Sequence, residues 1–163
     1  MEKQFVSLLN QNRAVLFKIC KMYCPDAEDR RDLFQEIVFQ LWKAFPTFRQ
    51  ESNVNTWVYR VGMNTAISNF RKEKRRQSPA GFSLPDMDFP DFEANENAPS
   101  ETALLYHAID QLSAVEKAMV LLYLDEKSYD EMAGILGISK SNVGVKLSRI
   151  KMKLEKIIKS ITL

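Results

Sequence analysis

The chain has 163 residues and a formal net charge of +2, a length that accommodates one domain or two small ones. Its longest apolar run, residues 118–124, is far shorter than a membrane span and its first residues are polar, so we expect a cytoplasmic protein that is not embedded in a membrane. Cys20 and Cys24 have no second Cys or His pair beside them, which predicts buried thiols and neither a metal site nor a disulfide.

The apolar residues follow helical spacing along the chain and glycine is scarce, which together predict an all-α fold. Residues 2–23 predict one or two helices, with Phe5, Leu8, Leu9, Leu16, Phe17 and Cys20 facing inward. After Pro25, Asp26 can cap a further helix that ends at Pro46. The apolar stripe of this helix comprises Leu33, Phe34, Ile37, Val38, Leu41, Trp42 and Phe45.

A polar loop then leads into a long predicted helix over residues 54–76. We expect its inward face to carry Val54, Trp57, Val58, Val61 and Phe70. Its polar surface would carry Asn55, Thr56, Tyr59, Arg60, Asn64, Ser68, Arg71, Lys72, Lys74, Arg75 and Arg76. Five of the last six residues are basic, so this end of the helix either holds phosphates or is an ordinary solvated helix terminus.

Residues 77–99 contain four prolines and no basic side chain, a composition typical of a linker. The sequence therefore predicts two small helical domains, over residues 1–77 and 100–163, joined by a flexible acidic linker over residues 78–99.

The second domain contains the pattern of a helix-turn-helix. Ser113 with Glu116 and Ser128 with Glu131 are spaced as capping boxes, which fix the starts of two helices. Gly137 suits the end of the helix that Ser128 begins, and Ser139 can cap the helix that follows. We expect the last two helices to bury Tyr129, Met132, Ala133 and Leu136, and then Val143, Leu147, Ile150 and Leu154.

The charge of this last helix favours DNA binding over a purely structural helical hairpin. Residues 139–163 contain seven basic side chains and one acidic side chain, whereas a solvated helix face usually mixes the two signs. The second helix of a helix-turn-helix enters the major groove, so a basic second helix fits that role.

Three stretches together resemble an RNA polymerase sigma factor of the extracytoplasmic-function (ECF) type. DLFQEIVFQLWKAF at residues 32–45 resembles the polymerase-binding helix of that family. TWVYRVGMNTAISNFRKEKRR at residues 56–76 resembles the helix beside the melted −10 promoter element. Residues 108–154 resemble the domain that reads the −35 element. The resemblance covers nearly the whole chain, in the order that the family has.

The resemblance implies a role for each stretch. Contacts with core RNA polymerase would be made by Asp32, Leu33, Gln35, Glu36, Phe39 and Trp42. Contacts with the −10 element of promoter DNA would be made by Asn53, Asn55, Thr56, Arg60, Asn64, Arg71, Arg75 and Arg76. Contacts with the −35 element would be made by Ser139, Lys140, Ser141, Asn142, Val145, Lys146 and Arg149. Apolar surface around Leu121, Leu122 and Leu124 would bind the polymerase flap.

The resemblance also implies a dedicated anti-sigma factor as a further partner, and it implies no small-molecule substrate, cofactor or catalytic residue. Two alternatives stay open from the residues alone: a conventional repressor or activator, and a helical adaptor whose basic ends serve solubility. Gly144 and Val145 depart from the family pattern, in which a basic or polar pair is common. We therefore expect −35 readout to rest more on shape, methyl contacts and phosphates.

Overall fold

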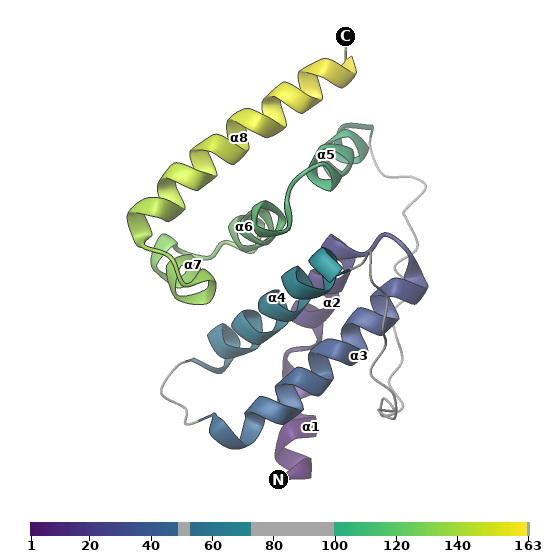
Figure 1. The fold of residues 1–163 in the computed structure, drawn as a ribbon, viewed down its shortest axis with the longest axis vertical. Coiled ribbons are helices and arrows are strands. Elements are labelled where there is room, and N and C mark those ends of the chain that lie inside the picture. Colours follow the sequence, from purple (N-terminus) through teal and green to yellow (C-terminus); the bar gives the residue numbers. More distant parts are fainter. Residues whose placement is uncertain (49–52, 73–99, 163) are drawn as a thin grey trace. The chain divides into compact units, whose positions relative to one another are not determined.

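The computed structural model describes residues 1–48, 53–72 and 100–162 (Figure 1). The regular elements in these ranges are all helical, which confirms the predicted all-α class. The chain divides into two compact units, Met1–Pro90 and Asp91–Leu163, and each is described by itself. The predicted linker over residues 78–99 and the basic side chains of Arg75 and Arg76 lie outside the described residues. No described helix is long and apolar enough to cross a bilayer.

The first unit begins with two helices rather than one. Helix α1 (Glu2–Gln11) ends and α2 (Arg13–Tyr23) begins around Asn12, which is buried. The Asn12 side chain donates a hydrogen bond to the carbonyl of Leu8 at 2.8 Å, so this buried amide group has a partner. All six residues that we predicted to face inward from these helices are buried.

Helix α3 (Ala27–Ala44) continues into a short 3-10 turn, η1 (Phe45–Thr47), where Pro46 stops the α-helical pattern. Asp26 occupies the expected cap position, but its side chain makes no capping hydrogen bond. Arg30 of α3 contacts the end of α2: its Nε donates a hydrogen bond to the carbonyl of Cys24 at 2.6 Å. Five of the seven residues in the predicted stripe are buried, whereas Trp42 and Phe45 remain partly exposed.

Helix α4 (Val54–Lys72) packs against α2 and α3, and its inward face differs from the predicted one. Tyr59, which we expected on the polar surface, is fully buried together with Val58, Met63 and Ala66. The predicted inward residues Val54, Trp57, Val61 and Phe70 are only half-buried. The buried side of α4 therefore includes Tyr59 and Ala66, a side that the distribution of residue types did not predict.

Gly62 lies where α4 packs against α2. A Cβ atom built on Gly62 would lie 2.9 Å from the Cδ1 of Ile19, which is fully buried. At that distance one of the two groups must shift, and the atom met is the end of the Ile19 side chain. A side chain at Gly62 would therefore require the Ile19 side chain to move.

The second unit consists of α5 (Ser100–Asp110), α6 (Ala114–Leu124), α7 (Tyr129–Leu136) and α8 (Lys140–Thr162). Both predicted capping boxes are confirmed: Ser113 caps α6 with Glu116, and Ser128 caps α7 with Glu131. Their hydrogen bonds measure between 2.9 and 3.3 Å. They fix where each helix starts, as local sequence predicted.

The turn between α7 and α8 also follows the prediction. Gly137 ends α7 with φ of 70°, a left-handed conformation that favours glycine. The Ser139 hydroxyl accepts a hydrogen bond from the amide of Asn142 at 3.2 Å and so caps α8. Together these residues produce the tight corner of a helix-turn-helix.

The cores of α7 and α8 agree with the prediction only in part. Val143, Leu147 and Ile150 of α8 are buried, and Leu154 is half-buried. In α7, Met132 is buried and Ala133 and Leu136 are half-buried, but Tyr129 is 40% exposed, and Ile135, which we did not predict to face inward, is buried.

Candidate polymerase and nucleic-acid interfaces

The outward face of α3 gathers four of the predicted polymerase contacts. Asp32, Gln35, Phe39 and Trp42 are spaced i, i+3, i+7 and i+10, which places them along one side of the helix. Leu33 is 1% exposed and so supports the helix from the core. Glu36 lies on the other flank, where it accepts a hydrogen bond from Gln40 at 2.9 Å.

The aromatic end of this face is held against α1. The Trp42 ring stands edge-on to the Phe5 ring, with 5.0 Å between centroids and 63° between planes. Phe5 also contacts Phe45, at 5.4 Å between centroids. Lys43 places its ammonium 5.5 Å from the centre of the Phe39 ring. Trp42 thus keeps 38% of its surface exposed while one edge is fixed by a buried ring.

The predicted −10 contacts fall into two groups on α4. Thr56, Arg60, Asn64 and Arg71 lie within about 80° of one another around the helix axis, so they share one side of α4. Arg60, Asn64 and Arg71 are exposed. This side is continuous over four turns and carries two positive charges, an arrangement suited to a nucleic-acid strand.

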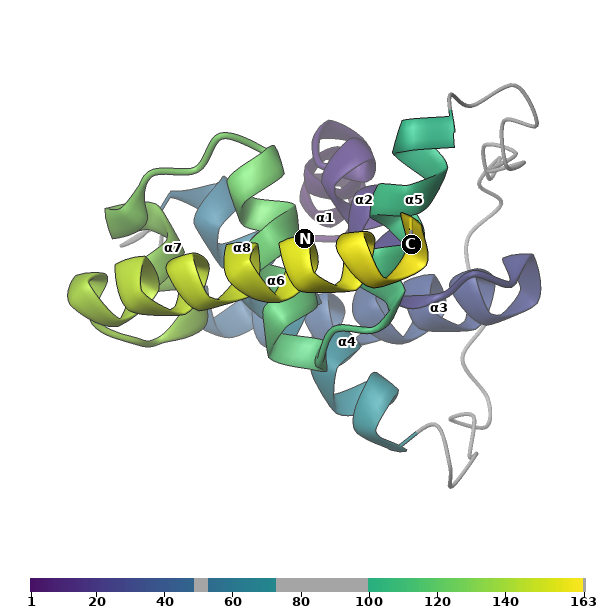
Figure 2. The same cartoon turned by 90° about the horizontal axis from the view of Figure 1, so that it is seen from above.

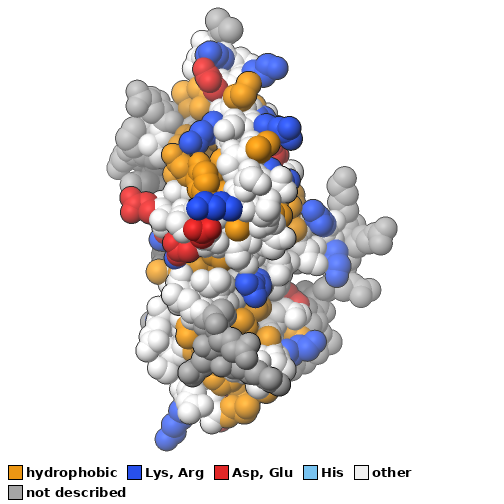
Figure 3. Space-filling view, turned by 90° about the vertical axis from the view of Figure 1, so that its left-hand side faces the viewer, with side chains coloured by type: hydrophobic (Ala, Val, Ile, Leu, Met, Phe, Trp, Pro, Cys, Tyr) orange, Lys and Arg blue, Asp and Glu red, His pale blue; other side chains and the backbone are white. Residues whose placement is uncertain are grey.

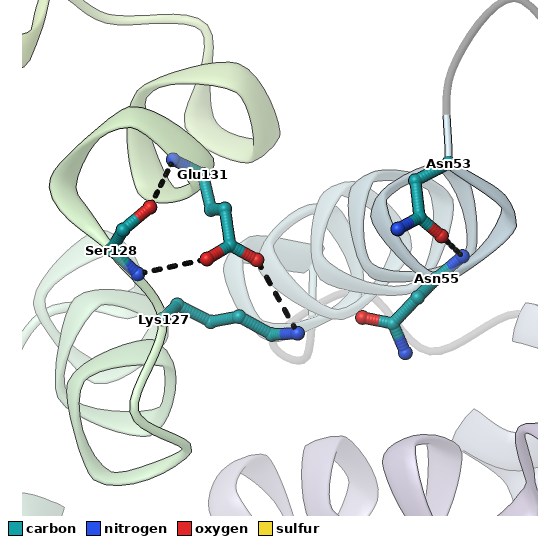
Figure 4. Close-up of polar contacts among 5 residues, drawn as sticks. All are labelled: Asn53, Asn55, Lys127, Ser128 and Glu131. Carbon is teal, nitrogen blue, oxygen red and sulfur yellow. Dashed lines mark hydrogen bonds and ion pairs between the residues drawn. The ribbon is translucent and has the colours of Figure 1, made fainter.

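Asn53 and Asn55 form the other group, at the start of α4. The Asn53 side-chain oxygen accepts a hydrogen bond from the backbone amide of Asn55 at 3.0 Å (Figure 4). Asn53 therefore acts as a cap of α4, a role that its sequence context did not predict. Nearby, the ring of Trp57 stacks on Phe48 with 4.6 Å between centroids. Trp57 is half-buried, with the Phe48 ring stacked against it.

The exposed side of α8 brings the predicted −35 contacts into one row. Ser141, Val145 and Arg149 recur every four residues and are all exposed, Val145 to 49%. Lys146 is exposed beside this row. Ser139 and Asn142 combine exposure with the capping hydrogen bond described above. Lys140 forms an ion pair with Asp130 of α7 at 3.3 Å, between two side chains that are mostly exposed.

Gly144 lies beside α7, on the flank of α8 between the buried side and the exposed row. A Cβ atom built there would be 3.6 Å from Cε2 of Tyr129, an ordinary van der Waals distance. Nothing in the packing of this unit therefore requires glycine at this position, although glycine in a helix interior costs about 1 kcal/mol relative to alanine.

Comparison with known proteins identifies the two units. The Sigma-70 region 2 family model matches residues 8–76, and the Sigma-70 region 4 family model matches residues 102–154. Together these matches cover most of the chain, and they fall on α1–α4 and α5–α8. The chain belongs to the extracytoplasmic-function sigma factors. Proteins of this family are initiation subunits of RNA polymerase, which confirms the predicted function.

Relatives of this sigma factor match it over most of its length. It is 28% identical over 169 residues to the ECF RNA polymerase sigma factor SigX of Bacillus subtilis, covering 94% of this chain and 86% of SigX. It is also 28% identical to the RNA polymerase sigma factor YlaC of the same organism, with 79% and 77% covered.

Two solved structures share the fold of the sigma factor. One is the sigma factor RpoE in complex with the anti-sigma factor NepR from Bartonella quintana, with a TM-score of 0.69 at 21% identity, covering 96% of this chain and 98% of RpoE. The other is CnrH in complex with the cytosolic domain of CnrY, with a TM-score of 0.69 at 18% identity and coverages of 98% and 90%.

The apolar surface of region 4 in this sigma factor is smaller than predicted. Leu121 and Leu122 are buried, so of the three leucines expected to bind the flap only Leu124 is exposed. Tyr123 beside it is 46% exposed. Figure 3 shows exposed hydrophobic side chains interspersed among Lys and Arg on the face of the molecule that it draws.

Sequence reasoning missed two contacts that tie α8 to α6. Lys153 forms an ion pair with Glu116 at 2.9 Å, and the Lys151 ammonium lies 4.5 Å from the centre of the Tyr123 ring. Burial raises the pKa of the Glu116 carboxyl, but hydrogen bonds from Ser113 and Lys153 lower it by more. The net pKa is therefore below its ordinary value. No local signal could reveal such pairs, because their partners are about thirty or more residues apart in sequence.

The cysteines have no role in these surfaces. Cys20 and Cys24 are both buried free thiols. Burial raises the pKa of the Cys20 thiol far above its ordinary value, and the neighbouring Cys24 raises it further. A thiol held protonated in this way is a poor nucleophile, so Cys20 belongs to the core.

Proposed function

We propose that this sigma factor binds core RNA polymerase through the exposed side of α3, captures the melted −10 strand along α4 and reads the −35 element with α8. The polymerase-binding set is Asp32, Gln35, Phe39 and Trp42, with Leu33 and Glu36 in support. The −10 set is Thr56, Arg60, Asn64 and Arg71 with Asn55, extended by Arg75 and Arg76. The −35 set is Ser141, Asn142, Val145, Lys146 and Arg149, with Ser139 and Lys140 at the helix start.

One observation carries this proposal. Region 2 and region 4 each present an exposed row of polar and basic side chains on a single helix, along α4 and along α8. A promoter is contacted at two separate elements, one melted and one duplex, and two rows on two units fit that task. Arg and Lys in each row supply attraction to phosphates, and the polar side chains between them can contact bases.

The domain boundaries follow from the same division. We place the region 2 domain at residues 1–77, the acidic linker at 78–99 and the region 4 domain at 100–163. The protein acts in the cytoplasm as a polymerase subunit and has no catalytic activity of its own. By analogy with RpoE bound to NepR and CnrH bound to CnrY, an anti-sigma factor is a further partner.

Run-off transcription tests the proposal. Purified chain and core polymerase from its native cell are incubated with genomic promoter fragments, and transcripts are mapped to their start sites. We expect promoter-specific transcripts that depend on the chain. Arg149→Gln should reduce DNA binding at the −35 element, and Asn64→Ala should reduce opening at the −10 element. If no fragment gives a chain-dependent transcript with active core polymerase, the proposal is wrong; duplex binding without polymerase would then favour a conventional repressor or activator.

A further inference from the structure

Helix α8 crosses α6 (Figures 1 and 2). Two lysines of α8 contact α6 from opposite flanks of the crossing. Lys151 and Lys153 are two residues apart, so their side chains leave the helix in directions about 200° apart. The buried line of α8, through Leu147, Ile150 and Leu154, runs between those two directions. Each lysine therefore extends toward α6 on its own side of the contact.

The two lysines meet α6 near its opposite ends. Lys153 pairs with Glu116, in the first turn of α6, at 2.9 Å. The Lys151 ammonium lies 4.5 Å from the ring centre of Tyr123, in the last turn. These two positions on α6 are seven residues apart, or about 10 Å along the helix. A rotation of α8 about the crossing point would lengthen at least one of these contacts.

Glu116 is itself held in place. Its carboxylate accepts a hydrogen bond from the backbone amide of Ser113 at 2.9 Å, as part of the capping box, and its side chain is 24% exposed. The anchor for Lys153 is therefore a carboxylate fixed by the backbone, unlike the exposed carboxylates of Asp130 and Glu155 that pair with Lys140 and Lys159. Exposed pairs of that kind contribute little to a fixed geometry.

The remaining cations of α8 have a different setting. Lys146, Arg149 and Lys156 are exposed, and none of them has a protein partner among the described residues. They lie within about 80° of one another around α8, next to the row of Ser141 and Val145. Lys153 lies in the same arc, so its ion pair with Glu116, and not its direction, distinguishes it from them. Three side chains free to move toward phosphates thus flank the face assigned to base readout.

We propose that Lys151 and Lys153 are positioning residues, a brace that fixes the angle of the −35-reading helix on α6, and that Lys146, Arg149 and Lys156 are the cations that hold the phosphates. This inference rests on the proposed function of α8. It divides a basic stretch that looks uniform in sequence into cations committed to the fold and cations available to DNA.

The salt dependence of binding separates the two groups. Removing one cation that binds a phosphate lowers the slope of log affinity against log salt by about 0.9. The full chain, with core polymerase, is used to enrich a duplex from a random-sequence library. Binding of the full chain to that duplex and to a scrambled duplex is then measured by fluorescence anisotropy over a range of salt. We expect Lys156→Gln to lower the slope by about 0.9 and Lys153→Gln to leave it unchanged.

Specificity provides the second readout. Loss of the brace should reduce the affinity ratio between enriched and scrambled duplex by about threefold, because the reading face is less well aligned. Glu116→Gln should do the same, although removing a carboxylate near DNA would by itself strengthen binding. Glutamine at this position retains the capping box, and Lys153→Arg should retain the ratio because arginine restores the pair. Thermal melting confirms that each variant is folded at the assay temperature.

Each outcome has a distinct meaning. A slope that falls in Lys153→Gln as it does in Lys156→Gln would show that Lys153 binds phosphate, and the brace would be overturned. An unchanged ratio in Glu116→Gln would overturn it as well. If the unmodified chain enriches no duplex at all, the −35 assignment fails, and the brace falls with it.

Discussion

Asn53 and Asn55 are joined by a hydrogen bond from the backbone amide of Asn55 to the side-chain oxygen of Asn53, at 3.0 Å. Asn53 thereby satisfies one of the free amides at the start of α4. We expect Asn53→Ala to lower the free energy of unfolding by about 1 kcal/mol, because that amide loses its partner. Asn53→Ser, which can cap as asparagine does, should be close to the unmodified chain. Urea denaturation of the full chain measures both.

The same pair of residues separates capping from DNA contact. Asn53→Ser retains the cap and removes the side-chain amide group, so it should open promoters normally if capping is the role of Asn53. Asn55→Ala should reduce opening, since its side chain is assigned to the melted −10 element. Permanganate reactivity of −10 thymines in the holoenzyme measures opening. Normal opening by Asn55→Ala would show that the assignment of Asn55 to the −10 element is incorrect.

Trp42 allows a test of the polymerase-binding side of α3. Exposed tryptophans anchored by neighbouring rings are frequent hot spots of interfaces, so Trp42→Ala should weaken core polymerase binding by about tenfold or more. Gln40→Ala, on the other flank of the same helix, should weaken binding far less, because it removes only the hydrogen bond to Glu36. Leu33→Ala should instead destabilise the fold by about 2–5 kcal/mol, because Leu33 is buried. Affinity is measured by fluorescence anisotropy of the labelled chain, and equal effects of Trp42→Ala and Gln40→Ala would contradict the assignment.

Local features of this fold could be predicted from the sequence, whereas features that depend on the packing of helices could not. The capping boxes at Ser113 and Ser128 and the turn at Gly137 were predictable because each depends on residues within one helical turn. The burial of Tyr59 was not predictable, because it depends on how α4 packs against α2 and α3, and local residue type does not determine that packing.

The candidate site shows the same contrast. The row of Ser141, Val145 and Arg149 follows from helical spacing alone. The commitment of Lys153 to Glu116 depends on where two helices cross, and 37 residues separate the partners. Sequence therefore predicted which helices bind DNA, and the structure shows which cations of α8 contact α6, namely Lys151 and Lys153.

Gly62 allows a prediction about packing. The methyl group of Gly62→Ala would meet Cδ1 of Ile19 at 2.9 Å, so overpacking opposes the gain of about 1 kcal/mol in helix propensity. Ile19→Val removes that Cδ1 and costs about 0.5–1.5 kcal/mol by itself. We expect the double variant to be more stable than the sum of the two single changes, by about 0.5–3 kcal/mol. Additive effects in urea denaturation would show that the contact carries no strain.

For Gly144→Ala we predict a gain in stability together with a loss of DNA binding. Gly144→Ala should raise the free energy of unfolding by about 1 kcal/mol, because the new methyl would contact Tyr129 at 3.6 Å without a clash. Gly134→Ala in α7 should give a similar gain, since nothing lies within 4 Å of a Cβ built there. Thermal melting compares the two.

Binding to the enriched −35 duplex then distinguishes these glycines. We expect Gly144→Ala to weaken it and Gly134→Ala to leave it unchanged, since Gly144 lies within the reading helix, where the backbone can approach DNA closely. Equal affinity of both variants would exclude close approach as the reason for glycine at this position.

The carboxyl of Glu116 predicts a dependence of stability on pH. Its pKa in the folded chain is lower than its ordinary value of 4.5, because hydrogen bonds from Ser113 and Lys153 outweigh the opposing effect of burial. A depressed pKa contributes stability that is fully present above about pH 4.5 and is lost as pH falls through the lower folded value. Below that value, protonated Glu116 no longer forms an ion pair with Lys153.

Glu116→Gln provides the matched control for this titration. Glutamine keeps the capping box with Ser113 but carries no charge at any pH, so the contribution of Glu116 is absent from the variant. The difference in urea midpoint between the unmodified chain and Glu116→Gln should therefore be constant from pH 7 to about pH 5 and shrink at lower pH. Other carboxylates titrate equally in both proteins and cancel in the difference. A difference that grows on acidification would show that Glu116 is destabilising when charged, and that Lys153 does not stabilise it.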